Sequence, residues 1–459
     1  MTAVTHLVPA AVGARGKASG RFTCAFGRRF FLLLLIGLVW LGPAWSDPRY
    51  LLAMAAWDAA VLMAWLWDLN HLPKPEQLEV RRIWNAPPQL TVESNITLEI
   101  MNRSDRAVLA RFQDEVPVTL RSEIPQLEIA IPASGTGSAS YAICPRERGD
   151  AKLGVAYFRY QGALRLAERW ASAALAQTVR IYPNLEEAKR DTIYLIRTRQ
   201  IALEKRHKHQ PGQGREFESL REHRESDEWR DICWSATARR GKLISKSYQI
   251  ERSQTVWLVL DAGRLLRARV LGLSKLDHAV GAALSLAQVA LYSGDRVAML
   301  AYGRRVQQRL PAGRGASHVR ALVDGLAQVR GEELEADHRR AVEALSVLQK
   351  RRSLVVWLTD LSETATTPEV IESASHLAQR HLVLFVVIGQ PELRGMLAER
   401  PENPLQMYRY VAAQEIVQRR DVLLRTLRQQ GALTLEVEPA RLSSAVVNRY
   451  LLAKERSLI

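Results

Sequence analysis

The sequence is poor in cysteine and lacks the short motifs of several common enzyme classes. Its three cysteines, Cys24, Cys144 and Cys233, lie far apart and form no C-x-x-C pair. An odd count at these spacings argues against a disulfide framework and against a thiolate zinc site. The sequence has no H-E-x-x-H, no G-x-S-x-G and no G-x-x-x-x-G-K-[ST]. Zinc proteases, nucleophile-elbow hydrolases and P-loop nucleotide-binding proteins are therefore not indicated.

The composition is that of a globular protein with an excess of positive charge. The 459 residues correspond to roughly three domains. Hydrophobic residues make up 47% and charged residues 24%, which argues against wholesale disorder and against an all-membrane transporter. The net charge of +16 fits nucleic acid, anionic lipid or an acidic partner. Because basic and acidic residues are interspersed, we expect no nucleic-acid partner and assign much of the charge to membrane lipid headgroups.

The N-terminal part of the chain contains a basic tail and two apolar segments. Residues 1–29 carry basic side chains and no acidic one. Apolar runs follow at 30–45 and 50–67, and only Ser46–Arg49 separates them. Each run is slightly shorter than the ~20 residues that cross a bilayer, and a modest extension or local thinning covers the difference. The pattern predicts a transmembrane helical hairpin over residues 30–69.

The charges that flank this hairpin predict its orientation. Arg28 and Arg29 precede it, and three basic residues follow it within 74–82. The positive-inside rule then places both ends, and the bulk of the chain, on the cytoplasmic side of the inner (cytoplasmic) membrane. The alternative is a cleaved signal peptide, whose small-x-small site would lie at 44–46.

Residues 70–185 show the period-two pattern of half-buried strands. Apolar residues alternate with polar ones at 96–100 and again at 127–131, and turn-forming clusters separate such segments. Several short strands at this spacing predict a small β-sandwich-like domain. Residues 186–252 are expected to form a helical and linker region.

Beyond residue 253 the pattern changes to compact apolar runs. The runs lie at 256–260, 297–300, 354–358 and 382–388. Continuous apolar strands imply burial on both faces, as in a parallel sheet. Helical segments separate them, and one opens with Ser274-Lys275-Leu276-Asp277, which resembles a capping box. This alternation predicts a doubly wound α/β domain over residues 253–459.

Two aspartates end predicted strands of this domain and are candidate metal ligands. Asp261 ends the first run and Asp360 follows the third, at the edge where such folds bind ligands. The pair resembles a von Willebrand factor A-like domain, whose metal-ion-dependent adhesion site uses Asp-x-Ser-x-Ser to hold Mg²⁺. Gly263 and Leu265 stand at the two serine positions. Such a site also takes a threonine ligand from a second loop, and residues 331–338, the corresponding loop, contain no threonine. The site is therefore degenerate, and the alternative is that both aspartates cap loops or helix ends.

The most distinctive stretch is residues 214–239. It resembles the signature of the bacterial domain of unknown function 58 family, which reads G-x-E-F-x-x-L-R-x-Y, then P-G-D, then R-x-I-x-W-x-x-[ST]-A-R. His223 replaces the tyrosine, and Glu225-Ser226 replaces Pro-Gly. The matching residues are Gly214, Glu216, Phe217, Leu220, Arg221, Asp227, Arg230, Ile232, Trp234, Thr237, Ala238 and Arg239.

The resemblance implies an α/β von Willebrand factor A-like domain, preceded by a transmembrane hairpin and a β region. Members of this family commonly accompany MoxR-type AAA+ ATPases. The resemblance therefore also implies a non-enzymatic interaction or scaffold protein without a cofactor, acting in assembly or envelope maintenance. The signature residues expected to carry the interaction are Glu216, Phe217, Arg221, Asp227, Arg230, Asp231, Trp234 and Arg239.

Both the signature and the function have an alternative explanation. Arg221, Arg230 and Arg239 alternate with acidic residues, and arginine pairs bidentately with carboxylates. The alternative to a docking surface is an internal ion-pair network that joins the β region to the α/β domain. The alternative function is a divalent-metal-dependent adhesion or hydrolase module that uses Asp261 and Asp360.

Overall fold

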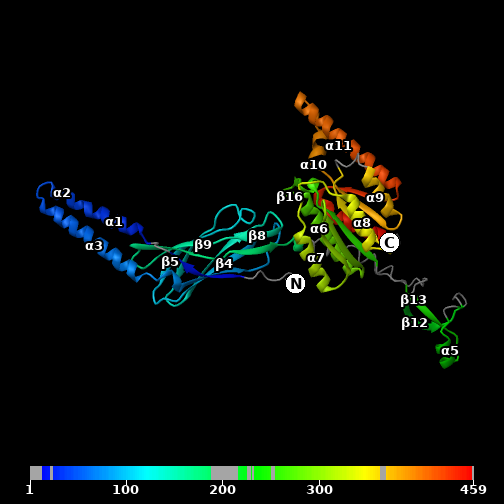
Figure 1. Ribbon diagram of the computed structural model, residues 1–459, viewed down its shortest axis with the longest axis horizontal. Helices are drawn as coiled ribbons and strands as arrows, with labels where there is room; N and C mark the ends of the chain where they lie inside the picture. Colours follow the sequence, from blue (N-terminus) through cyan, green and yellow to red (C-terminus); the bar gives the residue numbers. More distant parts are fainter. Residues whose placement is uncertain are drawn as a thin grey trace. The chain divides into compact units, whose positions relative to one another are not determined.

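The chain folds into two compact units, Met1–Tyr182 and Pro183–Ile459, which we describe separately (Figure 1). The computed structural model describes residues 13–20, 24–187, 216–224, 229, 232–249, 254–361 and 368–456.

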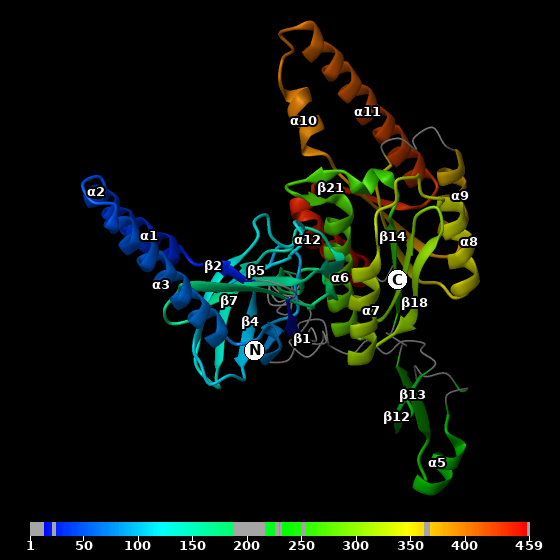
Figure 2. The same cartoon turned by 60° about the vertical axis from the view of Figure 1, so that its left-hand side comes forward.

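The N-terminal unit carries a pair of apolar helical segments. Its helices are α1 Arg28–Gly37, η1 Leu38–Trp40, α2 Leu41–Ala44, α3 Arg49–His71 and η2 Pro75–Gln77. α1 lies beside α3 in both views (Figures 1 and 2). The indole Nε1 of Trp57 donates to the carbonyl oxygen of Leu33 at 2.9 Å. A Cβ at Gly37 would lie 2.7 Å from the Trp57 ring, so glycine permits this close approach.

One helix among the described residues, α3, is long and apolar enough to cross a membrane. Its C-terminal end is attached to the sheet of the same unit. The buried Asp68 carboxylate accepts hydrogen bonds from the backbone N–H groups of Leu166 and Ala167, at 3.0 and 2.9 Å. A second spanning helix and the cytoplasmic placement of the chain remain predictions.

The rest of the N-terminal unit is a nine-stranded sheet in which every pairing is antiparallel. The order is β6-β5-β9-β10-β1-β3-β4-β7, with β2 also paired to β10. β6 and β7, at the two ends of this order, contact each other, so the sheet nearly closes around one hydrophobic core. The strands are β1 Ala14–Ser19, β2 Cys24–Phe26, β3 Leu78–Trp84, β4 Ser94–Asn102, β5 Val108–Asp114, β6 Gln126–Ile131, β7 Thr136–Ile143, β9 Ala156–Gln161 and β10 Ala167–Ala173; β8 Gly149–Leu153 and β11 Gln177–Ile181 form a separate pair.

The structure differs from the expectation that residues 1–29 form a separate tail. β1 pairs with β3 and β10, and β2 pairs with β10, so this segment supplies strands to the sheet. β1 reads Ala-Arg-Gly-Lys-Ala-Ser, in which small residues take the inward positions that large apolar ones usually fill. A Cβ at Gly16 would lie 2.6 Å from the carbonyl oxygen of Ala174, so the neighbouring backbone excludes a larger side chain.

A buried ion pair joins three strands of this sheet. The guanidinium of Arg82 in β3 contacts the carboxylate of Asp114 in β5, and both side chains are fully buried. Arg82 also donates to the carbonyl oxygen of Leu175 at 2.7 Å. The Tyr141 hydroxyl of β7 donates to Asp114 at 2.6 Å, and burial raises the pKa of this tyrosine. Each charge is thus hydrogen-bonded on several sides, as a buried ion must be.

The C-terminal unit contains a six-stranded sheet with the order β18-β17-β14-β19-β20-β21. Its strands are β14 Thr255–Asp261, β17 Arg296–Tyr302, β18 Val306–Gly313, β19 Leu354–Thr359, β20 Leu382–Ile388 and β21 Leu433–Val437. All neighbours pair in parallel except β17 and β18. From β14 the chain adds β17 on one side and β19 on the other. The apolar runs of the sequence therefore form adjacent central strands.

Helices cover both faces of this sheet (Figure 2). The helices are α6 Lys275–Tyr292, α7 Ala316–Gln328, α8 His338–Leu348, α9 Pro368–Ala378, α10 Pro391–Ala398, α11 Pro404–Gln429 and α12 Leu442–Glu455. α8, α9 and α11 pack against Trp257, Val259 and Phe385 on one face. α6 contacts β14, β17 and α12. α6 begins with the predicted capping box, in which Ser274 accepts from the N–H of Asp277.

The buried ion pair of the N-terminal unit makes a first prediction. Arg82→Met should destabilise this unit by about 3–5 kcal/mol, because it leaves the Asp114 carboxylate buried without its counter-ion. Arg81→Met, half-buried on the same strand, should cost about 1 kcal/mol or less. Pulse proteolysis of the detergent-solubilised chain in urea, read on fragments of the N-terminal unit, measures both. Equal losses for the two variants would contradict the assigned role of the pair.

Candidate functional site

The candidate site lies at the carboxyl ends of two neighbouring parallel strands. β14 ends at Asp261 and β19 ends at Thr359, with Asp360 directly after it. Because Leu260 pairs with Leu358 across these strands, the two carboxylates and the threonine hydroxyl come to one edge of the sheet. All three side chains are buried. The sequence thus placed the two aspartates at the correct strand ends.

A lysine from another element completes the cluster. Lys275 is the first residue of α6, and its ammonium contacts the Asp360 carboxylate; both side chains are fully buried. The hydroxyl of Thr359 donates to Asp261 Oδ2 at 2.7 Å, and the backbone N–H of Gly263 donates to Asp261 Oδ1, also at 2.7 Å. The carboxylates of Asp261 and Asp360 are therefore both bound by other groups of the chain.

The protonation equilibria of the cluster follow from its burial. Burial raises the pKa of Asp261, while the nearby His338 and the hydrogen bond from Thr359 act in the opposite direction. Burial lowers the pKa of Lys275, and the charge of Asp360 opposes that shift. Each charge is costly on its own in this environment, so the ion pair and the hydrogen bonds are what make the charges tolerable.

A line of aromatic hydrogen bonds borders the cluster. The Trp357 indole N–H donates to the hydroxyl of Tyr302 at 2.7 Å, and that hydroxyl lies 2.8 Å from His338 Nδ1. Burial raises the pKa of Tyr302 well above its usual value, and the charge of Asp261 adds to the shift. These side chains satisfy one another's hydrogen-bonding groups at the rim of the site.

The site as folded does not fit Mg²⁺. A cavity of about 10 Å³ is lined by Asp261, Asp360, Gly263 and His338 among others, and this is about the minimum that can hold one water. Mg²⁺ needs near-octahedral oxygen coordination and usually keeps several waters. Lys275 moreover already places a positive charge on Asp360. Among the described residues, no group of three or more His, Cys, Asp or Glu side chains could hold a metal ion.

Sequence reasoning missed two members of this cluster. The sequence indicates Lys275 only as part of a capping box, and no local pattern indicates that its side chain reaches a strand end 85 residues away. A threonine ligand is expected in residues 331–338, whereas Thr359 lies on the strand itself, next to Asp360. The sequence signal that indicates Thr359 is the Thr-Asp pair that ends an apolar run.

The described part of the signature forms one strand of a small separate sheet and a short helix in the C-terminal unit, where a helical and linker region is expected from the sequence. β12 Glu216–Glu222 pairs antiparallel with β13 Ile244–Gln249, and α5 Trp234–Arg240 lies between them in the chain. Phe217 and Arg221 also belong to β12, where they pair with Tyr248 and Ser245. His223 Nδ1 lies 2.7 Å from the Ser245 hydroxyl.

The other signature residues differ in exposure: Ile232 is buried, and Thr237 is half-buried and accepts a hydrogen bond from the N–H of Ile244 at 3.1 Å. Trp234 is 65% exposed and Arg239 is also exposed, as is Trp229 at 72%. Asp227, Arg230 and Asp231 lie outside the described residues. The proposed ion-pair network therefore remains a prediction, and Trp234 and Arg239 of α5 are exposed to solvent.

Comparisons with known proteins agree with the signature. The model of the family "Protein of unknown function DUF58" matches residues 219–395. Uncharacterized proteins of Mycobacterium bovis and Mycobacterium tuberculosis are 25% identical over 183 residues, which is 39% of this chain and 57% of theirs. The chain thus spans less than two thirds of the length of these relatives.

Solved structures show weaker similarity. The conserved hypothetical protein BatB from Bacteroides thetaiotaomicron is 14% identical, with a TM-score of 0.32, and the match covers 44% of this chain and 100% of BatB. An uncharacterized membrane-spanning protein from Vibrio fischeri is 13% identical, with a TM-score of 0.17, over 44% of this chain and 96% of that protein. Scores this low do not establish a common fold.

The lysine in the strand-end cluster makes a second prediction. Lys275→Met should destabilise the C-terminal unit by about 3–5 kcal/mol, because the Asp360 charge stays buried. Lys242→Met is the control and should cost about 1 kcal/mol or less, since Lys242 and its partner Glu222 are both 72% exposed in the same unit. Urea unfolding measures both variants. If Lys275→Met cost no more than the control, the ion pair would not hold this site together.

Divalent cations provide a third test of the same site. Because Lys275 already pairs with Asp360 and the cavity is only about 10 Å³, Mg²⁺ or Mn²⁺ should leave the thermal unfolding midpoint of the full chain unchanged within about 1 °C. The variant Asp261→Ala/Asp360→Ala should respond to the cations in the same way. A stabilisation of the wild-type chain that disappears in this variant would establish a metal site.

Proposed function

We propose that this chain is a membrane-anchored, non-enzymatic interaction protein that partners a MoxR-type AAA+ ATPase in assembly or envelope maintenance. In this proposal the ATPase hydrolyses ATP, and the chain supplies the membrane tether and a docking surface. The tether is the α1–α3 region as a two-helix hairpin in the inner membrane, with the bulk of the chain in the cytoplasm. The match of residues 219–395 to the family model supports the proposal, since the ATPase partner is what the resemblance to that family implies.

The single observation that carries the docking role is the exposure of two tryptophans in the signature segment. Trp229 and Trp234 are 72% and 65% exposed. Tryptophan is enriched among the residues that dominate protein–protein binding energies, because its large ring loses much water contact when a partner covers it. Two exposed tryptophans within one short segment are therefore the residues of the signature best suited to binding a partner.

The α/β unit is proposed to be von Willebrand factor A-like. Its strand order and the helices on both faces support this assignment. In such a unit the cluster of Lys275, Asp261 and Asp360 would stabilise the strand ends instead of binding a metal ion. The small cavity and the contact between Lys275 and Asp360 favour this proposal over the metal-dependent alternative function.

The fourth prediction tests the docking surface. Trp234→Ala should weaken capture of the ATPase by about tenfold or more, because it removes a ring that the partner buries. Tyr408→Ala is the control, since Tyr408 is 76% exposed on α11 of the same unit. The measurement is affinity capture of the tagged, detergent-solubilised chain from its native membranes with a non-hydrolysable ATP analogue, read by mass spectrometry.

Three outcomes of this experiment decide the matter. Enrichment of an AAA+ ATPase with the wild type and the control, but not with Trp234→Ala, supports the proposal. Recovery of envelope proteins without any such ATPase contradicts it. Loss of the ATPase in Tyr408→Ala alone would move the docking surface from the signature segment to α11.

A further inference from the structure

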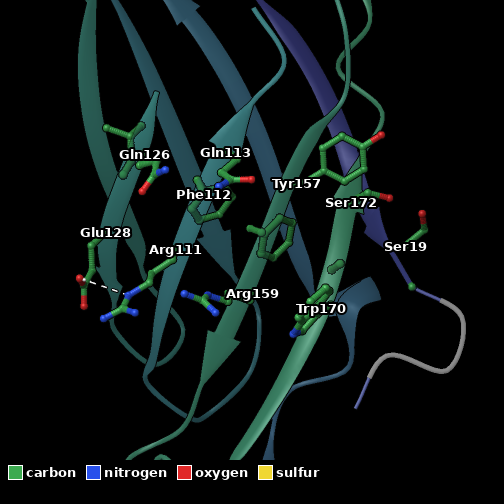
Figure 3. Close-up of a pocket in the computed structure, with 14 residues that line it drawn as sticks. Ser19, Arg111, Phe112, Gln113, Gln126, Glu128, Tyr157, Arg159, Trp170 and Ser172 are labelled. Carbon is green, nitrogen blue, oxygen red and sulfur yellow. Dashed lines mark ion pairs between the residues drawn. The ribbon is translucent and has the colours of Figure 1, made fainter. Parts of the chain in front are cut away.

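The outward face of the N-terminal sheet contains a large open hollow. It has a volume of about 920 Å³, within the range typical of ligand sites, and lies over β5, β6, β9 and β10 (Figure 3). This hollow is remote in sequence from the signature segment. Nothing in the proposed ATPase partnership uses it.

Strand register arranges its side chains in two rows. In the first row, Glu128, Arg111, Arg159 and Trp170 are successive partners across β6, β5, β9 and β10. The second row, two residues along each strand, consists of Gln126, Gln113, Tyr157 and Ser172. Alternate residues on the same strands point the other way, into the hydrophobic core. The positions of the side chains in both rows are therefore set by the strands of the sheet and not by loops.

Two aromatic rings on this face are exposed to solvent. Trp170 and Tyr157 are each 54% exposed, on neighbouring strands. An aromatic ring on a half-polar sheet face loses its contact with water when an apolar side chain covers it. Trp, Tyr and Arg, the three residue types that dominate measured binding hot spots, all occur in this one hollow.

The two arginines are only partly neutralised. Arg111 and Arg159 are direct cross-strand partners, and Figure 3 shows their side chains next to each other. Like charges placed opposite one another in a sheet are destabilising. Arg111 approaches Glu128 at 3.4 Å, with both side chains half exposed, and Arg159 approaches Glu168 only at 4.0 Å. An incoming carboxylate can therefore gain bidentate hydrogen bonds from either guanidinium.

We propose that this face binds an acidic peptide segment of a protein partner. Its carboxylates bind between Arg111 and Arg159, and its apolar side chains cover Trp170 and Tyr157. The amides of Gln113 and Gln126 carry both donors and acceptors, which suits the peptide main chain. The positive charges of Arg111 and Arg159 favour an acidic peptide over a basic one. Their guanidinium groups can bind carboxylates bidentately, which favours an acidic peptide over a neutral sugar.

The test is direct binding of a fluorescent peptide to the full chain in detergent. The probe alternates aspartate and leucine over eight residues, and its counterpart replaces each aspartate by lysine. Arg111→Glu/Arg159→Glu should weaken binding of the acidic probe by about tenfold or more, and so should Trp170→Ala. Arg106→Glu is the matched control, because Arg106 is a half-exposed arginine in the turn before β5 and outside the hollow. Fluorescence anisotropy gives the dissociation constants.

Every outcome has a defined meaning. Binding of the acidic probe that the double variant and Trp170→Ala lose and the control keeps supports the proposal. Equal binding of the lysine peptide, binding of a neutral oligosaccharide alone, or no effect of the double variant overturns it. Self-association of the wild type that the double variant abolishes, without binding of the acidic probe, also overturns it, because the occupant is then a second copy. Trp234→Ala should leave the probe affinity unchanged, so this test fails or succeeds independently of the ATPase capture.

Discussion

The contact between Lys275 and Asp360 is the constraint on which the interpretation of the C-terminal unit depends. An ion pair with both side chains fully buried is tolerated only when the charges contact each other and other polar groups. Here the lysine at the first position of α6 meets the end of β19, so helix and strand are held in one arrangement. The same contact neutralises the carboxylate that a metal would need. In many α/β proteins this edge of the sheet binds ligands. Here its charged side chains contact one another and connect α6 to the end of β19.

The N-terminal unit depends on comparable polar contacts, which leave one face of its sheet free. Arg82 and Asp114 are satisfied in the interior, and Asp68 attaches α3 to the start of β10. These contacts hold the strands in a fixed register. The outward rows with Arg111 and Trp170 then follow from that register. A rigid scaffold that carries exposed aromatic and arginine side chains is suited to binding a partner, because little conformational entropy remains to be lost.

Much of the fold could be predicted because its signals are local. The apolar runs at 256–260 and 354–358 became central strands β14 and β19, and the Ser274 capping box opened α6 as expected. The N-terminal strands could not be predicted, since β1 contains small and basic residues without an apolar alternation. Its place in the sheet depends on Gly16, which permits a close backbone approach that composition does not reveal.

The sequence alone determined the apolar helices, the four apolar strands β14, β17, β19 and β20, and the absence of three familiar enzyme motifs. These properties follow from periodicity and spacing within a few residues of one another. Only the tertiary structure decided which charges meet: Lys275 with Asp360, 85 residues away, and Arg111 opposite Arg159. Such pairs depend on strand order and register, which the hydrophobic pattern of a single strand does not encode. The sequence therefore indicated the two aspartates of the candidate site, whereas Lys275 and the proposed peptide surface became visible only in the folded chain.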